Sequence, residues 1–94
     1  AKHGLTLHGY EALLKEQGGV CAICEKPESR KYKGKALALV VDHDHACCST
    51  VPACGRCVRA LLCHKCNVSI GLADDSPERL RAMADYIERF RERV

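Results

Sequence analysis

The sequence predicts a small α+β domain that is held together by metal more than by a large apolar core, and three observations support this. The chain of 94 residues contains eight cysteines and only 4% aromatic residues, which allows a single domain, residues 1–94, with a modest core. Two widely separated C-x-x-C pairs can supply metal ligands. Helical periodicity at both ends and one extended apolar segment between the pairs supply the α and β elements.

The first predicted helix runs from Leu7 to about Gln17 and precedes the first cysteine pair. Its inner face repeats at helical spacing through Tyr10, Leu13, Leu14 and Gln17. The dipeptide Gly18-Gly19 ends the run, as glycine commonly does after the last helical turn.

One strand pair is expected between the cysteine pairs. Residues 36–42 are apolar, with β-branched residues near their end, as in a strand. Residues 57–62 are expected to pair with them. The turn-prone residues 46–55 connect the two segments.

Two helices are expected after the second cysteine pair. The first is short and follows Cys63. The second has Ser76 as its N-cap and Pro77 at its first helical position. We expect the apolar stripe of this last helix to pack in the core, with a dimer contact as the alternative; it comprises Leu80, Met83, Ala84, Ile87, Phe90 and Val94.

The two C-x-x-C pairs, Cys21 with Cys24 and Cys63 with Cys66, match the ligand spacing of a structural zinc site. Two such pairs complete a tetrahedral four-thiolate site, which leaves no position open to a substrate. The alternative is a pair of redox-active dithiols, which is less favoured because neither pair lies in a thioredoxin-like βαβ pattern.

The four remaining cysteines lie between the pairs. We expect a second zinc ion on Cys48, Cys54 and Cys57, with either Cys47 or His45 as the fourth ligand. Free thiols or a disulfide are the alternatives.

Charge and hydropathy narrow the class of protein. The formal charge of +3 falls to about +1 when a four-thiolate zinc is included, so net charge alone does not indicate a nucleic-acid partner. The longest apolar run, residues 36–41, is too short to cross a membrane, and the first residues lack a signal pattern. A soluble, cytoplasmic protein without a membrane partner is expected, because cysteines in a reducing compartment serve more often as metal ligands than in disulfides.

The sequence Asp42-His43-Asp44-His45 is the densest group of potentially catalytic side chains. Metal-assisted phosphodiester hydrolysis needs oxygen ligands for a hard divalent ion and a neutral histidine that accepts a proton from water. Asn67, directly after Cys66, can supply an amide oxygen. Taken alone, these residues are also compatible with a zinc-binding or solvent-exposed loop.

Three segments, taken together, resemble the phage recombination endonuclease VII family, within the HNH, or His-Me finger, nucleases. They are GGVCAIC at residues 18–24, VDHDH at 41–45 and VRALLCHKCN at 58–67. The resemblance extends from about Tyr10 to Phe90. It implies a zinc-stabilised ββα-metal core with flanking N- and C-terminal helices. The chain departs from the family pattern at Ala60, where glycine is usual, and in the additional cysteines of the connecting loop.

The resemblance also implies residue roles. Asp42 and Asn67 would hold a catalytic Mg²⁺ or Mn²⁺, His43 would act as general base, and His45 would assist at the phosphate. Arg59 is a candidate phosphate contact because of its charge and its position before the second cysteine pair.

The expected function is therefore metal-dependent cleavage of DNA by nicking or double-strand cleavage, with branched DNA among the candidate substrates. It would take place in the host cytoplasm if the chain is phage-encoded, by a monomer or a homodimer. The alternative is a non-catalytic zinc module that binds nucleic acid or protein.

Overall fold

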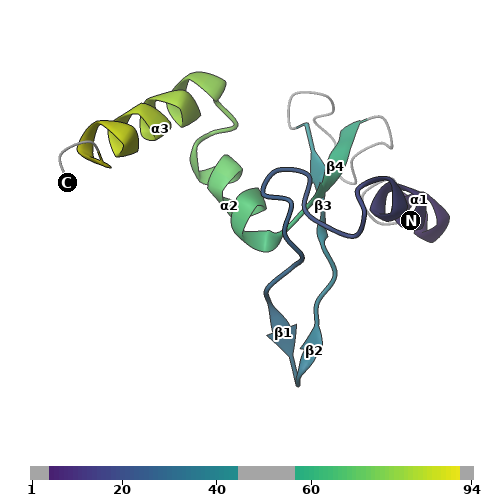
Figure 1. Cartoon of the computed structure of the whole chain (residues 1–94). Helices are drawn as coiled ribbons and strands as arrows, with labels where there is room; N and C mark the ends of the chain where they lie inside the picture. Colours follow the sequence, from purple (N-terminus) through teal and green to yellow (C-terminus); the bar gives the residue numbers. More distant parts are fainter. Residues whose placement is uncertain (1–4, 45–56, 92–94) are drawn as a thin grey trace.

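The computed structural model describes residues 5–44 and 57–91, which form three helices and two small sheets (Figure 1). The small α+β class that the sequence predicts is confirmed. In chain order the elements are α1 (Leu7–Glu16), β1 (Lys31–Tyr32), β2 (Lys35–Ala36), β3 (Val40–His43), β4 (Val58–Leu62), α2 (His64–Leu72) and α3 (Pro77–Arg91). Strand β1 pairs antiparallel with β2, and β3 pairs antiparallel with β4.

Helix α1 forms where the sequence predicts it and lies beside the β3–β4 hairpin (Figure 1). The side chain of Thr6 caps its first turn by accepting a hydrogen bond from the backbone N–H of Gly9 at 3.0 Å. Gly18, with φ of 71°, ends it in the left-handed conformation that glycine adopts most readily. The apolar face of α1 packs on a core made of Cys21, Leu39, Leu61, Leu62 and Cys63.

Gln17 joins α1 to strand β4. Its amide nitrogen donates to the carbonyl oxygen of Leu61 at 2.9 Å, and its amide oxygen accepts from the N–H of Leu61, also at 2.9 Å. Gln17 thereby satisfies the N–H and the C=O of Leu61, which lie on the side of β4 that faces away from β3. A polar residue fits on the inner face of α1 because it covers this open strand edge.

The strand predicted over residues 36–42 is wrong at its start, whereas its end lies within one residue of the predicted Asp42. Ala36 belongs to the separate β1–β2 hairpin, which turns at Lys33 and Gly34 with φ of 50° and 81°; this is the pattern of a two-residue type I′ turn. Strand β3 begins only at Val40. Among the intervening residues, Leu37 and Ala38 are exposed, whereas Leu39 is buried in the core and its carbonyl accepts a hydrogen bond from the Tyr10 hydroxyl at 2.7 Å.

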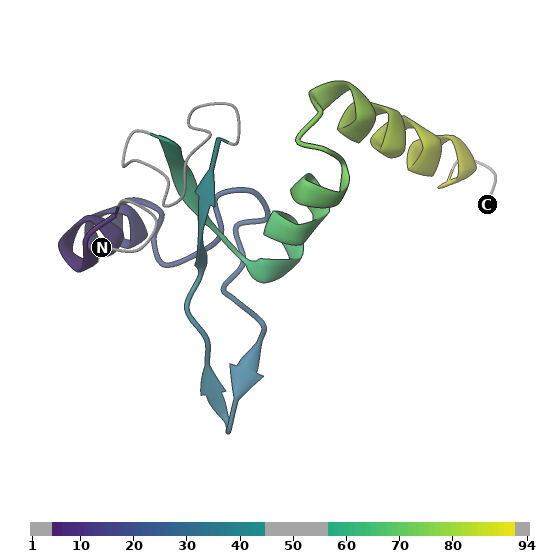
Figure 2. The ribbon, with the colours of Figure 1, turned by 180° about the vertical axis from the view of Figure 1, so that it is seen from behind.

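Helix α3 begins at Pro77 as predicted, with the Ser76 hydroxyl accepting a hydrogen bond from the N–H of Arg79. The prediction that its apolar stripe packs in the core is wrong. None of residues 77–91 is buried, and the side chains of Met83, Tyr86, Ile87 and Phe90 are exposed. Both views show the reason, because the turn after α2 directs α3 away from the β3–β4 hairpin (Figures 1 and 2). Within the described part of the chain, no helix has the length and apolar character needed to span a bilayer.

Glu28 fixes the start of α2. Its carboxylate accepts hydrogen bonds from the backbone N–H of His64 at 2.8 Å, and from the backbone N–H and guanidinium of Arg30 at 3.1 and 3.2 Å. Burial alone would raise the pKa of Glu28, but these hydrogen bonds and the Arg30 charge lower it from 4.5 to about 2. An ionised carboxylate therefore holds the segment before β1 against the first residue of α2.

Glu28→Gln should lower the free energy of unfolding at pH 7 by about 1–3 kcal/mol, because it weakens charge-assisted hydrogen bonds to a buried group. Glu11→Gln, on the exposed side of α1, should change it by no more than about 0.5 kcal/mol. The folded carboxyl has the lower pKa, so its contribution is complete above the unfolded pKa of about 4.5 and declines as the pH falls toward 2. Urea denaturation of both variants measures the effect, and an equal loss in the two would contradict it.

Candidate active site

Four cysteines gather into one cluster next to the core. The Sγ atoms of Cys21, Cys24, Cys63 and Cys66 all lie within 4.8 Å of one another. A tetrahedral zinc with Zn–S bonds near 2.3 Å requires sulfur atoms about 3.8 Å apart, and the Sγ atoms of Cys24 and Cys63 are separated by 3.8 Å. The cluster can therefore hold a metal ion such as zinc, as the spacing of the two pairs predicts.

The backbone around the cluster favours thiolates. Burial by itself would raise the pKa of the Cys21 thiol, but N–H groups of Cys24, Cys63 and Ile23 point at its sulfur and lower the pKa to about 6. Cys63 is the N-cap of α2 and accepts from the N–H of Cys66, so its sulfur lies at the positive end of the helix. Burial and the neighbouring sulfurs raise the pKa of Cys66 to about 12. Without a cation, thiols this close oppose one another's ionisation, and a divalent metal removes that opposition.

Asp42 lies on β3 with its side chain 7% exposed. The pairing of Asp42 with Ala60 and of His43 with Val58 leaves Arg59 as an extra residue in β4. Such a bulge interrupts the alternation of side chains, and the side chain of Arg59 reaches Asp42. Its Nε and Nη2 atoms donate to the two carboxylate oxygens at 2.6 and 3.1 Å.

Arg59 also contacts a second carboxylate. Its Nη2 and Nη1 atoms donate to the two oxygens of Asp75, in the turn after α2, at 2.9 and 3.1 Å. The hydrogen bonds that Arg59 donates to Asp42 and Asp75 raise the pKa of Arg59 above its usual value. Sequence reasoning missed Asp75, because the dipeptide Asp74-Asp75 resembles any polar turn between two helices and has no motif of its own.

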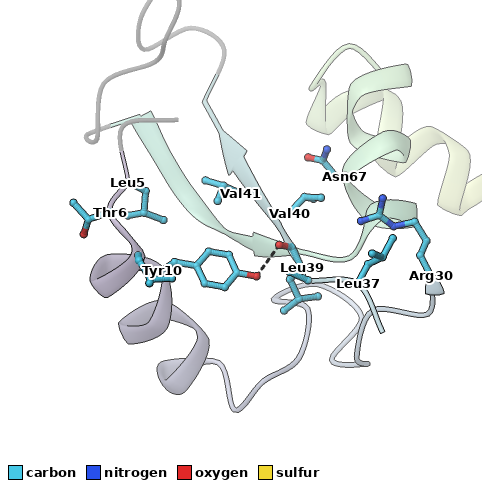
Figure 3. Close-up of a pocket in the computed structure, with 11 residues that line it drawn as sticks. Leu5, Thr6, Tyr10, Arg30, Leu37, Leu39, Val40, Val41 and Asn67 are labelled. Carbon is cyan, nitrogen blue, oxygen red and sulfur yellow. Dashed lines mark hydrogen bonds between the residues drawn. The ribbon is translucent and has the colours of Figure 1, made fainter. Parts of the chain in front are cut away.

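Asn67 lies in the first half of α2, which packs across β3. Together with Val40 it lines an open groove of about 840 Å³ between α1, β3 and α2 (Figure 3). Val40 and Asp42 share a face of β3 by strand alternation. Val41, on the opposite face of β3, lines the same groove, whereas Asp42 and His43 are not among the lining residues. The placement of Asn67 beside Asp42 therefore stays a prediction.

The remaining predicted residues divide into two groups. His43 is half-buried at the last position of β3, and Asp44 follows with its N–H bonded to the carbonyl of Cys57 at 2.8 Å. His45, Cys47, Cys48 and Cys54 lie outside the described residues. Cys57 is buried and takes part in a disulfide bond. A disulfide-bonded Cys57 cannot bind zinc as a thiolate, so at this residue the structure favours the disulfide alternative over the second zinc ion.

Purified chain should contain zinc, and removing it with a strong chelator should abolish cooperative thermal unfolding, because structural zinc contributes on the order of 10 kcal/mol to folding. Cys63→Ser should behave like the chelated chain in calorimetry, whereas Ser69→Ala, on the same helix, should not. A melting curve that the chelator leaves unchanged would contradict the assignment. Metal analysis also counts the ions: two per chain support the second site, and one per chain excludes it.

Comparison of the sequence with known proteins identifies its family. The family model for recombination endonuclease VII matches residues 1–89. The chain is 38% identical over 90 residues to the Gene 59 protein of Mycobacterium phage D29, and 33% identical over 88 residues to that of Mycobacterium phage L5. These matches cover 95% and 93% of this chain but 47% and 46% of the phage proteins, so the chain spans about half their length. The chain belongs to the recombination endonuclease VII family.

Proposed function

We propose that the chain is an endonuclease of the HNH, or His-Me finger, type that hydrolyses phosphodiester bonds of DNA with a divalent metal ion. Family membership supports a nuclease. One structural observation supports the type: helix α2 starts in the cysteine cluster and packs across β3. In this proposal Asn67 lies on the side of the hairpin that Asp42 faces, and His43 directly follows Asp42 in β3.

The carboxylate of Asp42 and the amide oxygen of Asn67 are the hard ligands that suit Mg²⁺ or Mn²⁺. When bound, the ion supplies positive charge to the phosphate and to the leaving 3′ oxygen. The cysteine cluster takes no part in the reaction in this proposal, since four thiolates leave zinc no open position. Its contribution is to fix Asn67 next to β3.

The imidazole of His43 removes a proton from the water that attacks phosphorus, which leaves a 5′ phosphate and a 3′ hydroxyl. Arg59 donates hydrogen bonds to a phosphate oxygen, a geometry that a guanidinium fits well. His45 assists at the phosphate. The relatives are phage proteins, so we place the reaction in the host cytoplasm, with plasmid DNA and branched duplexes as the substrates to compare.

His43→Ala should reduce the rate of plasmid nicking by roughly 10²- to 10⁴-fold, because the general base is lost. Zinc content and DNA affinity should stay near those of the parent chain. His8→Ala removes an exposed histidine from α1 and should leave the rate within about twofold. Gel assays with Mg²⁺, Mn²⁺ and EDTA measure nicking, and full activity of His43→Ala would remove His43 from the mechanism. Zinc-dependent DNA binding without EDTA-sensitive nicking by the parent chain would instead favour the non-catalytic module.

Asn67→Ala should raise the Mg²⁺ concentration needed for half-maximal nicking by at least about tenfold, because an oxygen ligand is lost. Ser69→Ala is the matched control, since the Ser69 hydroxyl donates to the carbonyl of Lys65 within the same helix. An unchanged Mg²⁺ dependence in Asn67→Ala would refute the ligand assignment.

A further inference from the structure

Asp42 and Asp75 share one guanidinium. Arg59 offers its Nε–Nη2 edge to Asp42 and its Nη1–Nη2 edge to Asp75, so each carboxylate receives two hydrogen bonds of 2.6 to 3.1 Å. Two anions and one cation give the three groups a formal charge of −1. The side chain of Asp42 is 7% exposed, whereas that of Asp75 is 24% exposed. The carboxylate proposed as a metal ligand is thus already paired with a cation.

The backbone holds Asp75 in place. Its N–H donates to the carbonyl of Ile70 at 2.9 Å, and the N–H of Asp74 donates to that of Gly71 at 3.1 Å; this is a Schellman ending of α2. Asp74 and Asp75 both have left-handed φ, at 57° and 56°, a conformation that disfavours most side chains but that aspartate tolerates. The carboxylate of Asp75 is therefore fixed relative to α2, the helix that carries Asn67.

A divalent ion on Asp42 changes the balance between the two pairs. The guanidinium on the same carboxylate, whose own side chain is 37% exposed, is then next to a second positive charge, and the two cations repel each other. The pair with Asp42 gives way first. The pair with Asp75 is complete by itself, so the guanidinium does not leave the site, and its Nε–Nη2 edge becomes available to a phosphate.

We propose that Asp75 is a positioning residue, which retains Arg59 beside the reaction centre while the carboxylate of Asp42 exchanges the guanidinium for a divalent ion. This inference rests on the proposed function. It makes Arg59 a competitor of the ion in the absence of DNA and a phosphate contact in its presence. The hydrogen bonds to Asp75 limit how far the Arg59 guanidinium moves when it changes from the one role to the other.

Mn²⁺ affinity without DNA tests the competition, by titration of the zinc-loaded chain under electron paramagnetic resonance. Arg59→Gln should bind Mn²⁺ several-fold more tightly, because the competing cation is gone. Asp75→Asn should bind it several-fold more weakly, because Arg59 then has Asp42 as its remaining carboxylate. Asp74→Asn makes the same charge change one residue away and should stay within about twofold of the parent chain. Equal effects of Asp74→Asn and Asp75→Asn, or weaker Mn²⁺ binding by Arg59→Gln, would overturn the proposal.

The rate of DNA cleavage at saturating Mg²⁺ tests whether Asp75 retains Arg59 beside the reaction centre. Asp75→Asn should lower kcat about tenfold, Asp74→Asn should not, and Asp75→Asn should cause no further loss in an Arg59→Gln background, because it acts through Arg59. Independent, multiplying losses in the double variant would refute the positioning role. Absence of both Mn²⁺ binding and cleavage in the parent chain overturns the proposed function as well. A parent chain that binds and cleaves, with Asp75→Asn equal to Asp74→Asn, overturns only this inference.

Discussion

The structure depends on the contact between two cysteine pairs that are far apart in the chain. Cys21 and Cys24 come from a turn after α1, and Cys63 and Cys66 come from the first turn of α2. The core that surrounds them is small, and two of its buried members, Cys21 and Cys63, are themselves cluster residues. Little apolar area is available to hold α2 against the hairpin in their absence. The position of every residue on α2, including Asn67, therefore follows from the cluster.

Polar side chains join the elements that the small apolar core does not hold together. Gln17 satisfies the exposed edge of β4, Glu28 binds the first N–H of α2, and Arg59 links β4 to the turn after α2. Each of these contacts joins a helix to a strand or to a long extended segment. Hydrogen bonds are strongly directional, so these contacts help to define the relative orientation of elements that share few apolar contacts. The proposed active site would benefit from this fixed orientation, because its residues come from three separate segments, β3, β4 and α2.

The charge of the Asp42 carboxylate is the central feature of the candidate site. Its carboxylate is almost completely buried and paired with Arg59, an arrangement that needs a cation for as long as the group stays ionised. Arg59 supplies that cation in the structure described here, and a divalent ion is the other species able to do so. The bulge in β4 makes the arrangement possible, because it brings Arg59 to the side of the hairpin on which Asp42 lies.

The sequence by itself determined the features that depend on neighbouring residues. Helix α1, the start of α3 at Pro77, the pairing of residues 57–62 with the strand that ends in Asp42 and His43, and the metal-ligand spacing are all properties of short segments, where periodicity, capping and chelate geometry act locally. The boundary of β3 was less accessible, because an apolar residue such as Leu39 suits a core position as well as a strand.

Only the tertiary structure decided which distant residues meet. The partners of Arg59 are 17 and 16 positions away, and Gln17 reaches a strand 44 positions along the chain. It also decided that the apolar stripe of α3 faces outward, because two left-handed residues in the preceding turn set the direction of the helix. Such contacts depend on the conformation of the whole chain between the two partners, which no local sequence pattern specifies.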